Sequence, residues 1–479
     1  MVSFIGRAPE LERLNQIAEK NSASLVVIKG RRRIGKSRLV KEFAKNYNFY
    51  SLSGTAPVLG VTAQSQREEF ASQLKLLGLP SIKSDDWNDL FFALAERVQK
   101  GRVVILLDEI SWMGSEDPFF LGKLKNAWDL YFSQNPKLTL IICGSASSWI
   151  EKNVLSSTGF LGRVSLTLTL RELSLSECRA FWGINNKANK NIADYEILKI
   201  LSVTGGVPKY LEEINPKISA EENIKNLCFT EGGFLVDEFE KIFSDIFLRE
   251  SVHYKNIVKS LSEGSKDLQS IQKDLNLESQ SRLSEYLNEL ELAGFITRDF
   301  TWDIKTGLDS KLSRYRLHDC YLRFYLKYIE KNISKIKRQA YGFKSLLALP
   351  SWPACMGFQF ENLVIHNRDL IYKKLNLNSE EIVSANPYFQ RRTSTHEACQ
   401  IDYMIQTKFN TLYICEIKFS KNVIGSGVID EVQSKINVLK HPKSFTCRPV
   451  LIHANGVTQD LIDHDYFAKI IDFSSLLLK

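Results

Sequence analysis

The stretch from Ser24 to Lys45, SLVVIKGRRRIGKSRLVKEFAK, decides the fold of the N-terminal part of the chain. Its first residues form a short apolar, β-branched run that is typical of a buried strand. Its last residues place apolar side chains at helical spacing. Between them lies GRRRIGKS, which fits the phosphate-binding loop GxxxxGK[ST]. The order strand, loop, helix predicts a parallel α/β fold that binds the phosphates of a nucleoside triphosphate.

The residue types in this loop suit a triphosphate bound together with Mg²⁺. Lys36 would reach the β- and γ-phosphates, and the Ser37 hydroxyl would ligate the metal ion. Backbone N–H groups of the loop and the positive end of the following helix would surround the phosphates. We therefore expect nucleotide contacts from the following residues: Gly30, Arg33, Gly35, Lys36, Ser37 and Arg38.

A second apolar run, VVILL at 103–107, predicts a buried parallel strand that ends in two carboxylates, Asp108 and Glu109. The carboxyl ends of strands are where parallel α/β sheets bind their ligands. We expect Asp108 to bind Mg²⁺ and Glu109 to polarise the attacking water. The alternative is that both are solvated turn residues.

Two further segments extend this predicted site. The strand-like run LTLIIC at 138–143 leads to Ser145, which could sense the γ-phosphate. Its neighbour Ser147 is as well explained as a helix cap. Arg163 precedes another strand-like segment and could act as an arginine finger that stabilises transition-state charge. A structural salt bridge is the alternative for Arg163.

The C-terminal part holds a different pattern of charged residues. Asp402 lies on one predicted strand, and Glu416 and Lys418 lie two apart on the next, after a turn at 408–411. Residues i and i+2 of a strand share a face, so Glu416 and Lys418 would point at one site. Glu361, on a predicted apolar helix, completes the set. Hard oxygen ligands beside a cation are what metal-dependent cleavage of a phosphodiester requires.

These residues resemble the PD-(D/E)xK nuclease fold, with Glu361, Asp402 and Glu416 as metal ligands and Lys418 near the scissile phosphate. The resemblance implies Mg²⁺ at this site, with Mn²⁺ as an alternative ion. Gln433 is expected on a following helix that flanks the site. The competing interpretation is a degenerate fold that only binds nucleic acid or protein.

Between the two ends, the sequence predicts mostly helices. Residues 170–250 have helical spacing, and three helices are expected at 253–263, 266–276 and 278–294. Two strands around the turn at 305–307 would complete a winged helix. If that module binds DNA, its recognition helix begins at Ser279 to Arg282. Glutamates on the same helix would repel phosphate, which slightly favours a packing or protein-binding role.

The N-terminal half also resembles the archaeal and bacterial ATPases of the AAA+/STAND group. The segments that carry the resemblance occur in order: FIGR at 4–7, the arginine-rich loop, LLDE at 106–109, CGS at 143–145, GR at 162–163 and TGGVPKYL at 204–211. The resemblance implies that Ile5 to Arg7 lie near the base, and that Gly206 and Pro208 lie against the nucleotide. It also implies a C-terminal nuclease-like domain and ATP as the nucleotide.

Composition sets wider limits. The net charge of +8 permits a nucleic-acid partner without requiring one. The eight cysteines are scattered and form no CxxC, which favours reduced thiols over a zinc site or a disulfide framework. There is neither a signal-peptide pattern nor an apolar run of about 18 residues, so we expect a cytoplasmic protein without a membrane partner.

Together these features predict an α/β multidomain chain. The expected parts are a P-loop parallel α/β/α ATPase core (1–170), a helical subdomain (171–250), a winged helix (251–318), a helical linker (319–352) and a restriction-endonuclease-like α/β domain (353–479). The leading hypothesis is ATP hydrolysis coupled to cleavage of nucleic acid, DNA rather than RNA. The alternatives are an ATP-driven signalling or scaffolding switch whose nuclease-like domain does not cut, and a DNA-binding regulator. A homo-oligomer is compatible with each.

Overall fold

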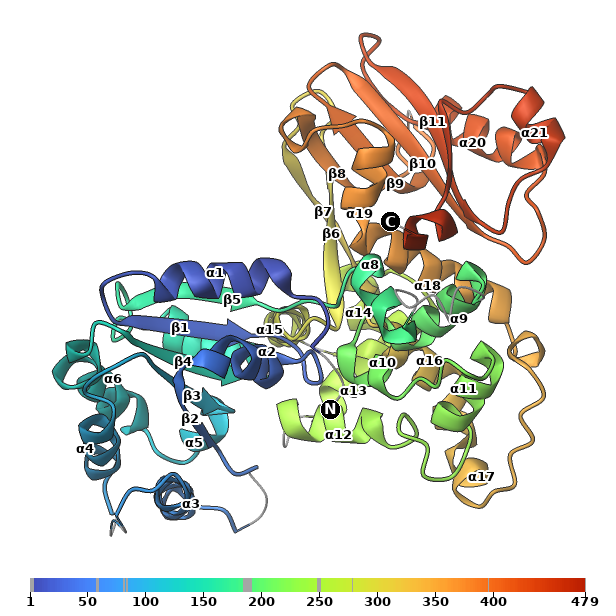
Figure 1. The fold of residues 1–479 in the computed structure, drawn as a ribbon. Helices are drawn as coiled ribbons and strands as arrows, with labels where there is room; N and C mark the ends of the chain where they lie inside the picture. Colours follow the sequence, from blue (N-terminus) through green and yellow to red (C-terminus); the bar gives the residue numbers. More distant parts are fainter. Residues whose placement is uncertain are drawn as a thin grey trace. The chain divides into compact units, whose positions relative to one another are not determined.

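A computed structural model describes residues 4–56, 60–80, 82, 85–183, 192–247, 251–277, 279–394 and 396–478. The chain forms two compact units. The first contains residues 1–173, 240–254 and 288–294, and the second contains 174–239, 255–287 and 295–479. Each unit is built around its own five-stranded sheet (Figure 1). The five domains expected from the sequence remain a prediction.

The sheet of the first unit is entirely parallel, in the order β2-β3-β4-β1-β5. Its strands are β1 (Ser24–Lys29), β2 (Asn48–Ser53), β3 (Val103–Asp108), β4 (Leu138–Gly144) and β5 (Val164–Thr169). The strands expected near 24–30, 103–107, 138–143 and 164–170 are confirmed. Because β4 lies between β1 and β3, the segments after these three strands meet at one edge of the sheet.

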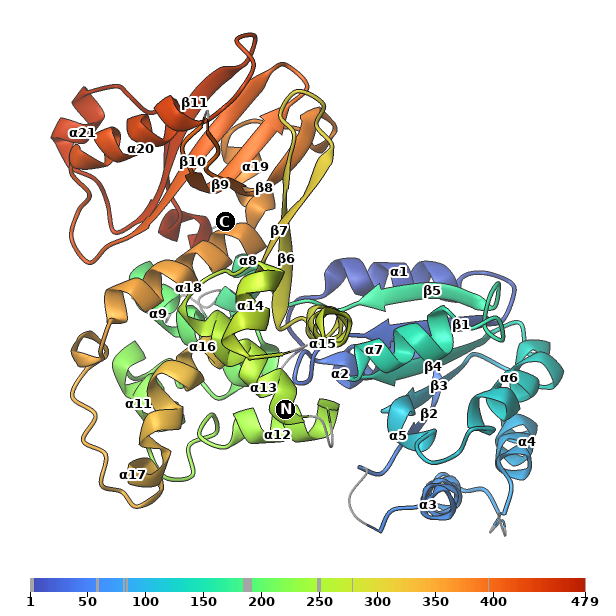
Figure 2. The ribbon, with the colours of Figure 1, turned by 180° about the vertical axis from the view of Figure 1, so that it is seen from behind.

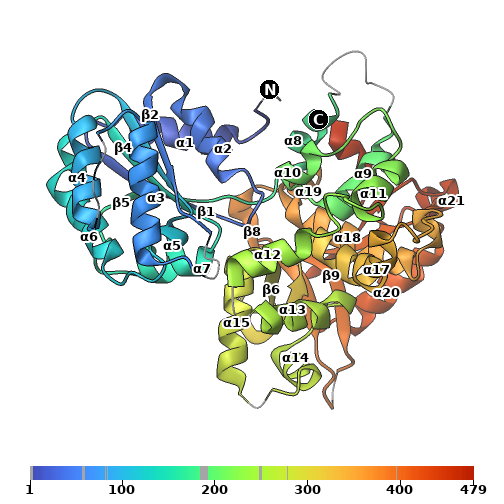
Figure 3. The same cartoon turned by 90° about the horizontal axis from the view of Figure 1, so that it is seen from below.

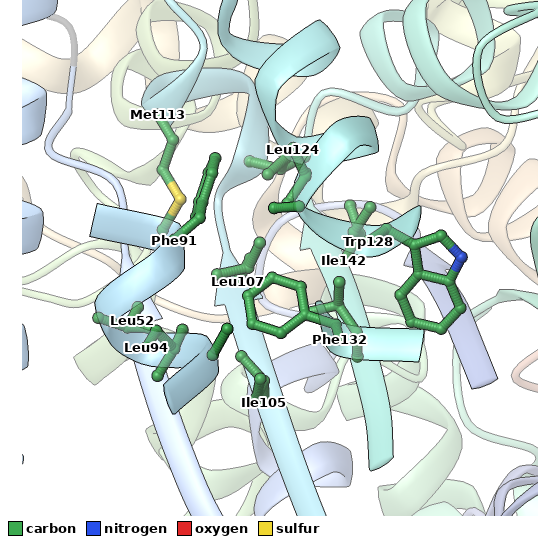
Figure 4. Packing of buried hydrophobic residues seen from close by; sticks show 14 of the residues in the cluster. Leu52, Phe91, Leu94, Ile105, Leu107, Met113, Leu124, Trp128, Phe132 and Ile142 are labelled. Carbon is green, nitrogen blue, oxygen red and sulfur yellow. The ribbon is translucent and has the colours of Figure 1, made fainter. Parts of the chain in front are cut away.

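Helices cover both faces of this sheet, as Figures 1 and 3 show. Alternate side chains of each central strand enter separate cores. Val26 and Ile28 pack with the helices α1 (Ala8–Ala18) and α2 (Lys36–Phe43). Leu25 and Val27 pack with α3 (Ala63–Leu76), α4 (Trp87–Arg97) and α6 (Phe120–Leu130). Figure 4 shows the second of these cores around Leu107 and Phe132. Burial on both faces explains why the strands read as continuous apolar runs rather than alternating ones.

The helices of residues 1–173 are short or of moderate length. They are α1 (Ala8–Ala18), α2 (Lys36–Phe43), α3 (Ala63–Leu76), α4 (Trp87–Arg97), α5 (Ile110–Met113), α6 (Phe120–Leu130) and α7 (Ser147–Ile150).

The middle of the chain is helical, as predicted. Its helices are α8 (Leu175–Arg179), α9 (Asp194–Thr204), α10 (Pro208–Glu212), α11 (Ala220–Cys228), α12 (Glu238–Phe247), α13 (Ser251–Ser260), α14 (Leu268–Asp274) and α15 (Gln280–Leu292). The antiparallel hairpin β6 (Ile296–Trp302) and β7 (Asp309–Leu317) follows. Three helices and a hairpin therefore occur where a winged helix was expected, although the assignment of that module remains a prediction.

The second sheet is mixed, in the order β12-β11-β10-β9-β8. Its strands are β8 (Ile382–Gln390), β9 (Cys399–Thr407), β10 (Thr411–Phe419), β11 (Thr446–Ala454) and β12 (Lys469–Asp472). Neighbours among β8, β9 and β10 are antiparallel, and β10, β11 and β12 are parallel. The remaining helices are α16 (Cys320–Phe324), α17 (Ile333–Lys337), α18 (Trp352–His366), α19 (Arg368–Lys374), α20 (Gly427–Val438) and α21 (Gln459–Asp463).

The hairpin β6–β7 lies along β8 of this second sheet, as Figures 1 and 2 both show. The Trp302 indole donates a hydrogen bond to Gln406 Oε1 (2.6 Å), and the Gln406 amide donates to Ile304 O (2.9 Å). Trp302 also packs edge-on against Tyr388. The base of the turn is thus part of the core of the C-terminal sheet.

Two sequence expectations concern the whole chain. The eight cysteines are all free thiols, and seven of them are buried. Within the described residues, none of the helices has the length and apolar character needed to span a membrane.

Candidate functional site

The phosphate-binding loop runs from the end of β1 to the start of α2. Gly30 has a φ of +150°, and a Cβ there would lie 2.5 Å from the carbonyl oxygen of Leu170. Gly35 has a φ of +90° and precedes the first residue of α2. Both positions need glycine, the first for close approach of the backbone and the second for its left-handed conformation. Arg33 is also left-handed (φ 71°), within the same loop.

Lys36 and Ser37 begin α2 and are held by the surrounding loop and strand. The Lys36 ammonium is buried and donates to the carbonyl oxygens of Gly30 (3.0 Å) and Arg31 (3.1 Å). The Ser37 hydroxyl donates to Asp108 Oδ2 (2.5 Å) at the end of β3. Ser37 and Asp108, predicted from distant motifs to share one metal ion, are therefore neighbours.

Glu109 and Ser145 form the next part of this edge. Glu109 adopts a left-handed conformation (φ 50°) directly after β3. One of its carboxylate oxygens accepts hydrogen bonds from both the backbone N–H and the hydroxyl of Ser145, each 3.0 Å long. The residue expected to polarise water is thus in contact with the residue expected to sense the γ-phosphate.

Arg7 fixes the N-terminal segment to the loop. Its guanidinium donates to the carbonyl oxygens of Ile34 (3.1 Å) and Arg171 (2.6 Å) and pairs with Glu10. The segment containing Ile5 therefore begins beside the phosphate-binding loop. Arg38, which is also expected to contact nucleotide, lies after the loop in the first turn of α2.

Arg163 forms a two-pronged ion pair with Asp129, at 2.7 and 2.8 Å. This ion pair corresponds to the structural salt bridge that was named from the sequence as the alternative to an arginine finger at Arg163. The pairing with Arg163 is the main cause that lowers the pKa of Asp129 to about 2. Gly206 and Pro208 belong to the second unit, where Pro208 is the first residue of α10. Their expected contact with nucleotide remains a prediction.

The C-terminal candidate site lies where β9 and β10 stop pairing. Their ladder ends at Tyr403 and Cys415, and Asp402 then accepts a hydrogen bond from the backbone N–H of Ile417 (2.9 Å). The Asp402 side chain replaces the carbonyl that a continued ladder would supply. Glu416, on the neighbouring strand, is 2% exposed.

Two lysines surround these carboxylates. Lys418 Nζ lies 3.1 Å from Glu416 and 2.6 Å from Glu431 on α20. Lys435 Nζ, one helical turn beyond Glu431, lies 2.5 Å from Glu416 and 3.6 Å from Asp402. For both lysines, burial lowers the pKa and the neighbouring carboxylates raise it, with a net increase.

Glu361 on α18 is the third carboxylate of this region. Burial, followed by the charge of Asp402, raises the pKa of Glu361 to about 7. Burial and the charge of Glu416 also raise the pKa of Asp402. Carboxylates whose charged forms are disfavoured in this way attract cations.

The donor set of Asp402 and Glu416 fits a hard divalent cation such as Mg²⁺. Lys435 already places a positive charge within 4 Å of both carboxylates. Among the described residues, no group of three or more His, Cys, Asp and Glu side chains stands close enough together to hold a metal ion. Glu361 would therefore have to move closer, or act through water, to join the other two.

Gln433 lies on α20, the helix that was expected to flank the site, whereas sequence reasoning missed Lys435 on the same helix. Gln433 is exposed and bonds to Asn437 and Tyr466. The helical spacing offered a signal, because Glu431 and Lys435 are four residues apart and share a helix face. The hairpin residue Arg316 was missed as well, since only the fold brings it near Glu361.

Comparisons with known proteins bear on the first unit most directly. Residues 4–214 match the model of an ATPase domain predominantly from Archaea. An uncharacterized protein of Methanocaldococcus jannaschii is 27% identical over 370 residues, which cover 75% of this chain and 76% of that protein. An uncharacterized ATP-binding protein of the same organism is 44% identical over 46 residues, 10% of this chain and 78% of its own length.

Among solved structures, the Walker-type ATPase of Pyrococcus abyssi is similar with a TM-score of 0.49 and 17% identity, covering 67% of this chain and 96% of that one. The parallel sheet, the phosphate-binding loop and the family match define the N-terminal part of the chain as an ATPase domain of the P-loop class. The similarity to the first of the two M. jannaschii proteins spans 370 residues, so it extends beyond the ATPase domain matched at 4–214.

Proposed function

We propose that the protein couples ATP binding and hydrolysis in its N-terminal domain to metal-dependent cleavage of nucleic acid, DNA rather than RNA, in its C-terminal domain. The observation that carries this proposal is the arrangement of Asp402, Glu416 and Lys418. Asp402 and Glu416 lie on neighbouring strands where the pairing of β9 and β10 ends, and the Lys418 ammonium lies 3.1 Å from Glu416.

In the ATPase domain, Lys36 would bind the β- and γ-phosphates, and Ser37 and Asp108 would hold Mg²⁺. Glu109 would orient the attacking water, with Ser145 holding its carboxylate in place. Ser145 would thereby link the presence of the γ-phosphate to the position of Glu109. Arg163 would contribute to catalysis only if it left Asp129.

In the C-terminal domain, Asp402 and Glu416 would hold Mg²⁺ or Mn²⁺, with Glu361 joining them directly or through water. When bound, the metal ion would supply Lewis-acid activation of the phosphodiester and of water. Lys418 would stabilise negative charge on the phosphate that is cut. Lys435 would have to leave the carboxylate pair when the metal ion binds.

The position of Lys435 favours one alternative function. An ammonium held between Asp402 and Glu416 neutralises them without a metal ion, which suits a fold that binds but does not cut. In that case the protein would be an ATP-driven signalling or scaffolding switch. We place either form in the cytoplasm, and we propose a homo-oligomer as compatible with both.

The decisive experiment incubates the purified full chain with plasmid, single-stranded DNA and RNA. Mg²⁺ or Mn²⁺ is supplied, with and without ATP. Metal-dependent cleavage supports the nuclease proposal. ATP hydrolysis without cleavage of any of these substrates supports the switch.

A further inference from the structure

The second unit contains a small, largely enclosed cavity beside Glu361 and Asp402. Its volume is about 40 Å³. The cavity is bounded by the hairpin β6–β7, the helices α16 and α18, and the strands β8 and β9. Three arginines face it from two elements: Arg314 and Arg316 from β7, and Arg323 from α16.

Arg323 is the unusual residue of the three. It is 1% exposed, and its guanidinium lies 4.9 Å from the ring of Phe358. One terminal nitrogen donates to Leu317 O (2.7 Å), but Nε and the other terminal nitrogen have no hydrogen-bond partner. A buried guanidinium with unsatisfied N–H groups is costly unless an anion or water occupies the space beside it.

Three carboxylates, those of Asp299, Glu361 and Asp402, face the cavity together with the three arginines. Arg316 and Asp299 satisfy each other in a two-pronged pair, and Asp402 has Lys435 and the Ile417 N–H as partners. Arg314 packs over Phe389, 5.2 Å from its ring centre. Within the part of the chain that the structure describes, neither Arg314 nor Arg323 forms an ion pair with a carboxylate, so both guanidinium groups remain open to an anion in the cavity.

The volume of the cavity and the guanidinium groups that line it limit the class of anion that can bind. A single water molecule needs roughly 10–15 Å³, so this cavity holds a group of a few heavy atoms and not a nucleotide. Guanidinium groups are suited to phosphate oxygens through several directed N–H groups. A phosphate bound there would lie beside the carboxylates proposed to cut a phosphodiester.

We infer that this arginine-lined cavity is a phosphate-binding site that receives the terminal phosphate of a nucleic-acid strand. A largely enclosed cavity can receive the end of a nucleic-acid strand. A phosphate within a continuous strand would not fit, because the strand would need a second opening through which to leave the cavity. The choice of a strand end rests on the proposed function in nucleic-acid cleavage. The binding of phosphate itself does not.

The test measures binding of the full chain to short single-stranded DNA in the presence of a chelator, so that no cleavage is needed. The oligonucleotides share one sequence and carry a 5′-phosphate, a 3′-phosphate or only hydroxyl ends. We expect one phosphorylated end to bind about tenfold tighter than the hydroxyl form, equivalent to about 1.4 kcal/mol. Inorganic phosphate should compete for the difference.

Arg323→Met should abolish this preference, because methionine fills the space beside Phe358 without charge, and Arg323→Lys should retain part of it. Arg314→Gln supplies a second variant, at a less buried position, should Arg323→Met fail to fold. Arg392→Met, at an exposed residue of the same unit, is the matched control. It should bind like the wild type.

Equal affinity for all strand ends, together with no effect of inorganic phosphate on the folded wild type, would overturn the inference. An end preference that survives in folded Arg323→Met would overturn its assignment to this cavity. Binding of inorganic phosphate that depends on Arg323, without an end preference, would support the site and identify free phosphate as its ligand. An end preference without any cleavage in Mg²⁺ would separate this inference from the proposed nuclease activity.

Discussion

At the scale of single residues, the carboxylate of Glu109 has one observed contact, with Ser145, and one proposed contact, with the attacking water. The structure shows it accepting two hydrogen bonds from Ser145, and in the proposed function the same group would orient the attacking water. Because one oxygen takes both bonds from Ser145, the second oxygen remains the candidate for contact with water. Ser145 therefore fixes the direction of the carboxylate without using all of its capacity as an acceptor.

Glu109→Gln should bind ATP but hydrolyse it at least about tenfold more slowly, a barrier increase of roughly 1.4 kcal/mol. The amide keeps the acceptor for Ser145 and loses the negative charge that polarises water. Steady-state phosphate release, with nucleotide binding measured separately, checks the result. Exposed Glu96→Gln in the same domain is the control, and near-wild-type turnover of Glu109→Gln would assign the water to another residue.

Glu361 makes stability depend on pH in a direction that follows from its surroundings. Burial and the charge of Asp402 raise its pKa from 4.5 to about 7, so the folded state holds the proton more tightly than the unfolded chain. The associated stability is fully present below about pH 4.5 and is lost as the pH rises through about 7.

Glu361→Gln stays neutral at every pH and should escape this loss. In a chelator, the free energy of unfolding of the wild type should fall relative to that of Glu361→Gln between pH 5 and pH 8. Denaturant titrations at both pH values measure the difference, with exposed Glu380→Gln as the control. Parallel pH dependence of wild type and Glu361→Gln would contradict the assignment of a raised pKa to this carboxyl.

At the scale of elements, the hairpin β6–β7 depends on one buried amide. Gln406 is 3% exposed and joins Trp302 to the carbonyl of Ile304. Gln406→Leu would leave two buried polar groups without partners, at a cost of roughly 1–3 kcal/mol each. Urea unfolding should show this loss, whereas the exposed Gln433→Ala should stay close to wild type. A loss no larger than that of the control would mean that water or another side chain replaces the amide.

The same hairpin has some features that could be predicted from the sequence and one that could not. Its strands and turn were predictable from local apolar runs and from the turn around Lys305 to Gly307. Its position on β8 was not, because docking depends on Trp302 and Gln406, which lie about a hundred residues apart and carry no local pattern. The arginine-lined cavity was hidden for the same reason.

The candidate ATPase site was more predictable, because each of its residues lies at or after the carboxyl end of a buried strand of one parallel sheet. Once the strands are recognised, the shared edge brings Lys36, Asp108, Glu109 and Ser145 together. The charged partners of Lys435 and Arg163 were harder to predict from the sequence. Their roles depend on which oppositely charged side chain the fold puts beside them, Glu416 in one case and Asp129 in the other.

At the scale of the whole molecule, the two candidate sites belong to separate compact units, each with its own sheet. Changes in one site should therefore leave the intrinsic chemistry of the other largely intact. Coupling between them, if it exists, would appear as an effect of ATP on cleavage. It would not appear as joint loss of both activities in a single-residue variant.

Asp402→Ala and Glu416→Ala should each abolish metal-dependent cleavage while ATP hydrolysis continues at close to the wild-type rate. Lys418→Ala should also lose cleavage but still bind the metal ion, because its ammonium acts on the phosphate. Glu361→Ala should lose less, since its carboxylate can act through water. Cleavage assays, phosphate release and calorimetric titration with Mn²⁺ separate these effects, with exposed Glu397→Ala as the control.

The result that would decide against the nuclease is the absence of cleavage by the wild type with either metal ion, with or without ATP. Lys435 then gains a defined role, because the ammonium between Asp402 and Glu416 would be the permanent partner of both carboxylates. Lys435→Ala distinguishes the two cases. In a nuclease it should preserve or strengthen metal binding, whereas in a metal-free switch it should destabilise the C-terminal domain by leaving two buried carboxylates facing each other.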